Sequence, residues 1–131
     1  MKPHTNVYTR LRVSKYGIGV FAVIPIFKGT ELFEGDPLPD MVQVNETYVE
    51  TLPFAIQKLY KDFCPLNKGI YDCPKSFDAM GQSWYLNHSD TPNCYMDKNY
   101  EHLYAIRNIK AGEELTIDYH TFSEIPNGET V

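Results

Sequence analysis

Eight consecutive residues carry the strongest pattern in the chain: Asn87-His88-Ser89-Asp90-Thr91-Pro92-Asn93-Cys94. They bring polar, hydrogen-bonding side chains directly after the apolar residues 84–86, which is typical of a buried edge that meets a ligand. Asn87 offers both an amide donor and a carbonyl acceptor, so it could hold the zwitterionic end or the base edge of a small ligand. The alternative is that Asn87, His88 and Ser89 only satisfy backbone groups of a turn.

Strand patterns lie on both sides of this stretch. Residues 7–13 alternate between two faces and predict a strand, which a turn over residues 14–19 joins to an extended segment, residues 18–24. Lys28-Gly29 predicts another turn before a short strand over residues 31–33. On the C-terminal side we expect strands over residues 102–109 and 114–119, joined by a turn at Lys110-Ala111-Gly112. The pattern predicts a mainly β fold.

The two strand-turn-strand segments also resemble each other. Residues 21–32 align without gaps with residues 104–115, and the identical positions are Ala, Ile, Gly, Glu and Leu. We therefore expect a pseudo-symmetric assembly of short sheets, with the remaining segments inserted between the two copies. The alternative is coincidence, because a glycine turn between two strands is common.

The middle of the chain departs from this β pattern. Its apolar residues recur at the spacing of one amphipathic helix over residues 51–63: Leu52, Ile56, Leu59, Tyr60 and Phe63. Thr51 is the expected cap, and Pro53 is tolerated in the first turn. We expect a loop over residues 35–39, loops or very short elements over residues 64–75, and a flexible tail over the last dozen residues.

Composition limits the functional classes. A chain of 131 residues, 43% hydrophobic and 22% charged, fits one globular domain. It has no apolar run long enough to cross a bilayer and no secretory signal, so we expect an intracellular protein without membrane association. Its three cysteines form no CxxC pair, and free thiols are expected. The net charge of -5 argues against direct nucleic-acid binding and favours a basic partner.

Two rival kinds of site have little support. His88, Asp90, Asp97 and His102 are close in sequence, but they lack the spacing of a zinc site, so we expect no metal. Cys94 and His88 could form a nucleophile pair. No activating pattern surrounds this cysteine, however, and a small core side chain is the expected role.

Taken in order, three motifs resemble the SET domain, the protein-lysine methyltransferase family: residues 14–22, residues 87–94 and residues 112–119. The resemblance implies a mainly β fold with one or two short helices. Its small sheets would form a β-clip, in which the Asn-His-Ser segment and the strand ending at Tyr119 thread into a C-terminal pseudoknot. It also implies a single domain over residues 1–123, with a helix-bearing insert at about residues 36–80, and a tail over residues 124–131.

The resemblance further implies an enzyme that transfers a methyl group from S-adenosylmethionine to a lysine amine of a protein. Tyr119 would be the catalytic residue at the transfer centre. The cofactor would contact this tyrosine and seven other residues: Tyr16, Gly17, Ile18, Gly19, Tyr71, Asn87 and His88. Two alternatives stay open, a non-catalytic binding module with the same fold and a methyltransferase that acts on another amine.

The expected partner is a lysine-containing, basic protein or peptide, and the expected location is the cytoplasm, or the nucleus if the substrate is chromatin. Many family members carry Gly-Asn and Arg-Phe before the Asn-His-Ser motif, where this chain has Met80-Gly81 and Trp84-Tyr85. We expect none of the cysteine-rich zinc-binding segments that flank many larger members. One wall of the lysine channel would therefore come from the tail, from residues 35–80 or from a second subunit, which makes a homodimer one expected assembly. Ile117 leaves the number of added methyl groups open.

Overall fold

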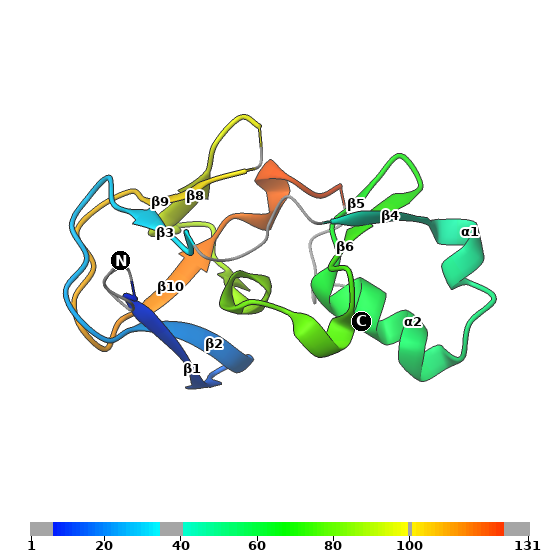
Figure 1. Ribbon diagram of the computed structural model, residues 1–131, viewed down its shortest axis with the longest axis horizontal. Helices are drawn as coiled ribbons and strands as arrows, with labels where there is room; N and C mark the ends of the chain where they lie inside the picture. The colour runs from blue at the N-terminus through cyan, green and yellow to red at the C-terminus, as the bar shows by residue number, and fades with distance from the viewer. Residues whose placement is uncertain (1–6, 35–40, 100, 125–131) are drawn as a thin grey trace, which may run out of the picture. The chain divides into compact units, whose positions relative to one another are not determined.

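The structure, a computed structural model, describes residues 7–34, 41–99 and 101–124. It is mainly β, with small sheets and short helices, as predicted (Figure 1). The chain forms two compact units. The first contains residues 1–36 and 81–118, and the second contains residues 37–80 and 119–131. The insert expected at about residues 36–80 thus forms most of the second unit. The loop expected at residues 35–39 lies outside the described residues.

A four-stranded and a three-stranded sheet form the first unit. In the larger sheet the order is β1 (Thr9–Ser14), β2 (Gly17–Ala22), β10 (Glu114–Ile117) and β7 (Asn87–His88), and β7 runs parallel to β10. The smaller sheet contains β3 (Glu31–Leu32), β9 (Leu103–Ala105) and β8 (Cys94–Met96) in that order. A short 3-10 helix, η2 (Gln82–Tyr85), precedes β7. Strands from all three motifs, β2, β7 and β10, therefore lie in one sheet.

The β1–β2 hairpin has a two-residue turn, because Ser14 pairs with Gly17 across it. Gly17 has a φ of +106°, a conformation that glycine adopts without the steric cost other residues meet. Further along the hairpin, Val20 of β2 pairs with Leu115 of β10, and both side chains are fully buried. This face forms the core side of the four-stranded sheet.

The predicted pseudo-symmetry is present in the backbone. Gly29 N–H donates to the Ala105 carbonyl at 2.8 Å, and the matching Gly112 N–H donates to the Ala22 carbonyl at 2.8 Å. Both glycines have a φ of +85°. Ile26 and Ile109, which match each other in the sequence alignment, form a β-bridge with each other. Because matching residues make matching bonds, the internal alignment reflects structure rather than coincidence.

The second unit combines a small sheet with helices. Its strands are β4 (Val42–Asn45), β6 (Ile70–Cys73) and β5 (Leu66–Asn67), in that order. Its helices are α1 (Glu46–Val49), α2 (Phe54–Phe63) and the 3-10 helices η1 (Phe77–Ala79) and η3 (Tyr119–Thr121). The core consists of five buried side chains: Val49, Cys64, Leu66, Tyr71 and Cys73.

Three local predictions need correction. The predicted helix begins at Phe54, after Pro53, and Thr51 does not cap it. Thr51 Oγ1 instead donates to the Tyr48 carbonyl at 2.6 Å, just beyond α1, a helix that the sequence pattern did not predict. The last strand ends at Ile117, so Tyr119 begins a 3-10 turn rather than ending a strand.

The start of the predicted tail is bonded to β5. Glu124 N–H donates to the Leu66 carbonyl at 2.9 Å, and Ser123 Oγ accepts a bond from Leu66 N–H at 3.1 Å. The remainder of the predicted tail, residues 125–131, lies outside the described residues. Within the described ranges, none of the helices has both the length and the apolar character that a bilayer span requires.

Candidate functional site

The glycine turn and Asn87 meet in the four-stranded sheet of the first unit. Asn87 Nδ2 donates to the Ile18 carbonyl at 3.3 Å and to Ser14 Oγ at 3.2 Å. The same Ser14 oxygen accepts a bond from Tyr16 N–H at 3.1 Å, within the hairpin turn. The structure therefore joins two predicted segments that are about 70 residues apart in the sequence.

Glu114, at the start of β10, completes this arrangement. Its Oε2 accepts a hydrogen bond from Asn87 Nδ2 at 2.7 Å. The carboxylate also covers Gly19, because a Cβ at residue 19 would collide with Glu114 Oε2 and lie 3.0 Å from Asn87 Nδ2. Glycine is thus required here by the close approach of another side chain, and its φ is not positive.

The orientation of the Asn87 amide follows from the chemistry of its partners. A backbone carbonyl and a carboxylate can only accept hydrogen bonds, so the amide group that faces Ile18 and Glu114 must be the nitrogen. Both hydrogens of Nδ2 are then directed into the protein. Among the described residues, Asn87 Oδ1 accepts no hydrogen bond, and it is the acceptor that this amide can offer to a ligand.

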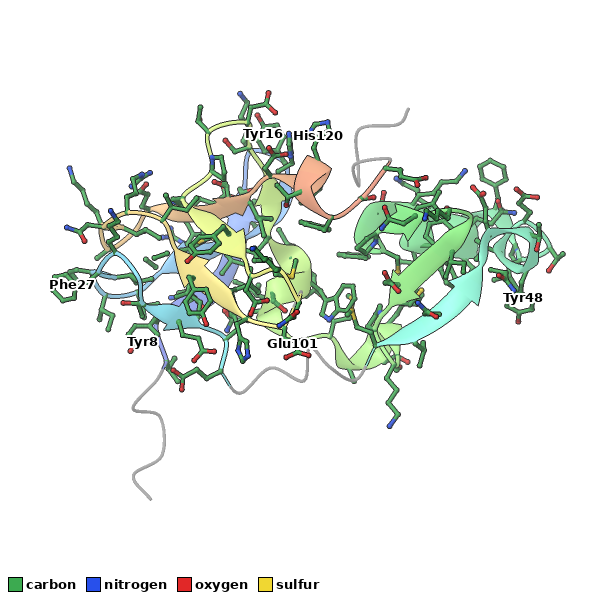
Figure 2. All side chains as sticks on the ribbon, turned by 90° about the horizontal axis from the view of Figure 1, so that it is seen from above. Tyr8, Tyr16, Phe27, Tyr48, Glu101 and His120 are labelled. Atoms are coloured by element: carbon green, nitrogen blue, oxygen red, sulfur yellow. The ribbon has the colours of Figure 1, made fainter. Side chains whose placement is uncertain are left out.

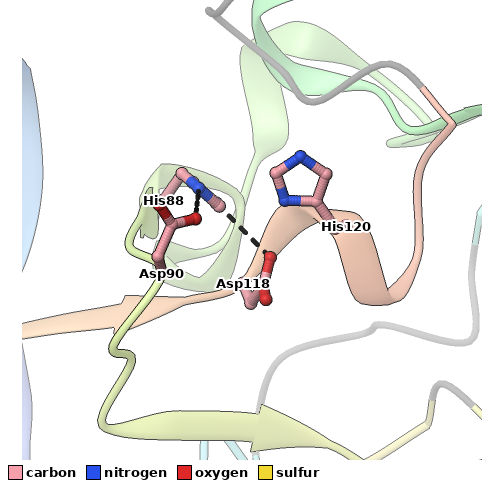
Figure 3. Close-up of side chains that lie close together, drawn as sticks. All are labelled: His88, Asp90, Asp118 and His120. Atoms are coloured by element: carbon pink, nitrogen blue, oxygen red, sulfur yellow. Dashed lines mark hydrogen bonds and ion pairs between the residues drawn. The ribbon is translucent and has the colours of Figure 1, made fainter.

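His88 lies between two carboxylates (Figure 3). Its Nε2 is 2.9 Å from Asp90 Oδ1, and its Nδ1 is 3.7 Å from Asp118 Oδ1. These contacts use the two nitrogens on opposite edges of the ring, so the two carboxylates hold the orientation of the imidazole. The Asp90 side chain is 85% exposed, so its contribution to stability is small.

Asn93, from the same motif, has a structural role. This asparagine is buried, and its Nδ2 donates to the Glu114 carbonyl at 2.8 Å while its Oδ1 accepts a bond from Thr116 N–H at 2.8 Å. Its own carbonyl accepts a bond from Ile106 N–H at 2.8 Å. Asn93 therefore links β10 to the chain that follows β9, and this holds the strand that presents Glu114.

Cys94 is fully buried, and burial raises the pKa of its thiol to about 12. A thiol with this pKa is a poor nucleophile at neutral pH. The structure confirms the prediction that Cys94 fills the core. The metal candidates Asp97 and His102 form a local turn, in which Asp97 Oδ1 accepts bonds from the N–H groups of Glu101 and His102.

The predicted aromatic residues lie in different surroundings. Tyr16 is 69% exposed at the surface of the first unit (Figure 2), beside the glycine strand. Tyr71 is 3% exposed in the core of the second unit, where its ring lies 5.7 Å from that of Tyr60. Tyr71 is thus part of the core of the second unit, and its predicted contact with the cofactor stays a prediction. Tyr119 belongs to the second unit, and its ring lies 5.8 Å from that of Phe122.

Two residues that accept hydrogen bonds from Asn87 were not predicted from the sequence. Glu114 was noted as part of a motif, and Ser14 as part of a turn, but neither was predicted to bond Asn87. The only signal for Glu114 was its motif. Strand pairing supplies the contact, since Glu114 pairs with Phe21 and Thr116 pairs with Asn87, which places these residues and Gly19 on one face of the sheet.

Comparisons with known proteins identify the family of the chain. A search of curated proteins finds no match. One solved structure that resembles the chain is that of a Plasmodium falciparum "putative histone methyltransferase", with 22% identity and a TM-score of 0.52 over 86% of this chain and 92% of the other. At this identity the likeness shows the fold alone. A family model described as the SET domain matches residues 17–120, most of the sequence. The chain therefore belongs to the SET domain family, whose members are typically protein-lysine methyltransferases.

Proposed function

We propose that the chain is an S-adenosylmethionine-dependent protein-lysine methyltransferase. The observation that carries this proposal is the joining of Asn87 to the glycine hairpin through Ile18 and Glu114. These hydrogen bonds connect two motifs that the family shares, and we take the connected residues as the proposed wall of the cofactor site. Family membership supports the same reaction class.

The chemistry of this wall fits the cofactor. S-adenosylmethionine carries two positive charges, on its sulfonium and its ammonium, and the wall is rich in acceptors: the Ile18 carbonyl, the Glu114 carboxylate and Asn87 Oδ1. Gly17 adds open space, because a Cβ there would have no neighbour within 4 Å. Such a wall attracts a cationic ligand and lets it approach the backbone closely.

In this proposal Asn87, the Gly17–Gly19 backbone and the exposed Tyr16 ring hold the cofactor. When bound, S-adenosylmethionine would supply a methyl group bonded to a positively charged sulfur. The lone pair of the amine would displace this sulfur in line, and the sulfur would leave as a neutral thioether. His88, held by Asp90 and Asp118, keeps the end of β7 in a fixed conformation. The Tyr119 phenol would orient the neutral lysine amine by hydrogen bonding, after the amine has lost its proton to solvent.

The proposed substrate is a basic protein. The net charge of -5 favours association with a positively charged partner over nucleic acid. The name of the Plasmodium falciparum protein suggests core histones as the first substrates to test.

Two experiments test this function. Isothermal titration calorimetry with S-adenosylhomocysteine should show saturable binding, and its absence would remove the cofactor assignment. Mass spectrometry of core histones incubated with the protein and S-adenosylmethionine should then show mass steps of one methyl group on lysine. Cofactor binding without any transfer would favour a non-catalytic module, while transfer only to small amines would favour the other alternative.

A further inference from the structure

The internal pseudo-symmetry gives Glu114 a counterpart within the same chain. Glu31 occupies the matching position, since Glu31 pairs with Tyr104 in the smaller sheet as Glu114 pairs with Phe21 in the larger one. Two residues before these partners stand His102 and Gly19, which therefore also match. The contacts of the Glu31 carboxylate can therefore be compared directly with those of the Glu114 carboxylate.

The two glutamates differ in what they contact. Glu31 Oε1 lies 2.6 Å from His102 Nδ1. In the smaller sheet, the side chain at the position that matches Gly19 therefore holds the carboxylate. In the other copy Gly19 has no side chain, and the Glu114 carboxylate occupies the space that a Cβ would take. Glu114 is therefore available to a residue outside the repeat, and it bonds Asn87 Nδ2 at 2.7 Å.

This bond is the strongest restraint on the Asn87 amide. The other two acceptors of Nδ2 are neutral and more distant, at 3.2 Å for Ser14 Oγ and 3.3 Å for the Ile18 carbonyl. A hydrogen bond to a carboxylate is shorter and roughly twice as strong as one between neutral groups. Without Glu114 the amide could rotate, and its carbonyl oxygen would no longer be fixed as the acceptor that faces a ligand.

We propose that Glu114 is a positioning residue that orients the Asn87 amide so that Oδ1 accepts a hydrogen bond from the ammonium group of the cofactor. This inference rests on the proposed function. Gly19 is needed for this positioning, because a side chain at residue 19 would displace the Glu114 carboxylate. Glu114 acts through Asn87, and no contact of its own with the cofactor is required.

Affinity for S-adenosylhomocysteine, measured by calorimetry, tests the role of Glu114. Glu114→Ala should weaken binding about 10- to 100-fold, as expected for the loss of a charged hydrogen bond. Glu114→Gln keeps an oxygen acceptor for Asn87 and should weaken S-adenosylhomocysteine binding less, by about fivefold. Glu31→Gln, the matched control in the other copy, should leave binding unchanged. Equal binding by the wild type and Glu114→Ala would overturn the proposal.

Side-chain amide NMR signals provide a readout that needs no ligand. The Asn87 NH₂ protons should lie downfield in the wild type and move upfield in Glu114→Ala, while Glu31→Gln should leave them in place. If the wild type binds no S-adenosylhomocysteine, the proposed function fails. The NMR comparison still decides whether Glu114 orients Asn87, and unchanged amide signals would refute that part.

Discussion

The backbones of Ile26 and Ile109 are bonded to each other reciprocally, because each N–H donates to the other's carbonyl oxygen at 2.8 Å. These residues match in the internal alignment, so the point where they meet relates the two strand-turn-strand copies. Both side chains are 1% exposed. The centre of the first unit is thus built twice from the same short pattern.

The pseudo-symmetry predicts that truncating either of the two matching isoleucines lowers the free energy of unfolding by the same amount. Ile26→Ala and Ile109→Ala should each lower the free energy of unfolding by about 2–5 kcal/mol, because each leaves a cavity at a fully buried position. Urea denaturation measures both. Ile106→Ala, at a position that is 37% exposed, is the control and should cost much less. A large difference between Ile26→Ala and Ile109→Ala would show that the two copies are not energetically equivalent.

Sequence reading predicted the first unit well because its signals are local. Alternation and glycine turns predicted the β1–β2 hairpin and β10 to within two residues of the observed bounds, whereas the strand expected over residues 102–109 ends at Ala105. The second unit was predicted less well. Its strand β4 pairs with β6 across 25 or more residues, and neither strand has a strong pattern of its own. Pairing at such distance depends on packing that periodicity does not reveal.

The site was predictable only in part for a similar reason. Motifs identified the glycine turn and Asn87, but the Glu114–Asn87 bond requires two different pairings of β10. Tyr71 was named as a cofactor contact from its residue type and approximate position, and these signals did not indicate its place in the core of the second unit. Residue identity indicates possible chemistry, whereas strand register decides which side chains meet.

Alanine at the two hairpin glycines should have different effects. Gly17→Ala should lower stability by about 1–2 kcal/mol, because φ is +106° there and the space around it is open. Gly19→Ala has no such backbone strain, but it should displace the Glu114 carboxylate and weaken S-adenosylhomocysteine binding at least tenfold. Thermal melts and calorimetry distinguish the two effects. A Gly19→Ala variant with wild-type affinity would show that the displaced carboxylate is not needed.

The cysteines should resist modification in the folded protein. All three are buried and unpaired by disulfides. Burial raises the pKa of Cys94 to about 12, and a hydrogen bond with Cys73 together with burial raises the pKa of Cys64 well above its usual range. At pH 8 only about one Cys94 in ten thousand would be a thiolate. Iodoacetamide labelling, read by mass spectrometry, should be slow until urea is added, and rapid labelling of Cys94 in the native protein would contradict this prediction.

Glu113 should contribute to stability in a pH-dependent way. Its hydrogen bond with Arg107 lowers its pKa from 4.5 to about 2. Because the folded pKa is depressed, the contribution is fully present above about pH 4.5 and is lost as the pH falls through about 2. We expect about 1–2 kcal/mol at pH 7, reduced by solvent because Arg107 is 53% exposed. Urea unfolding should show Glu113→Gln to be less stable than the wild type at pH 7, with the difference shrinking in acid. A difference that does not change with pH would rule out the ion pair as its cause.

Tyr119→Phe tests the proposed role of the phenol in catalysis. This residue begins η3, directly after the segment that pairs with β7, and removing one oxygen keeps its ring packing against Phe122. If the phenol orients the lysine amine, kcat for histone methylation should fall at least a hundredfold, while S-adenosylhomocysteine affinity changes less than about threefold. Tyr48→Phe, at an exposed tyrosine of the second unit, is the matched control. Full activity in Tyr119→Phe would remove the phenol from the mechanism, and a parallel loss of cofactor affinity would assign Tyr119 to binding instead.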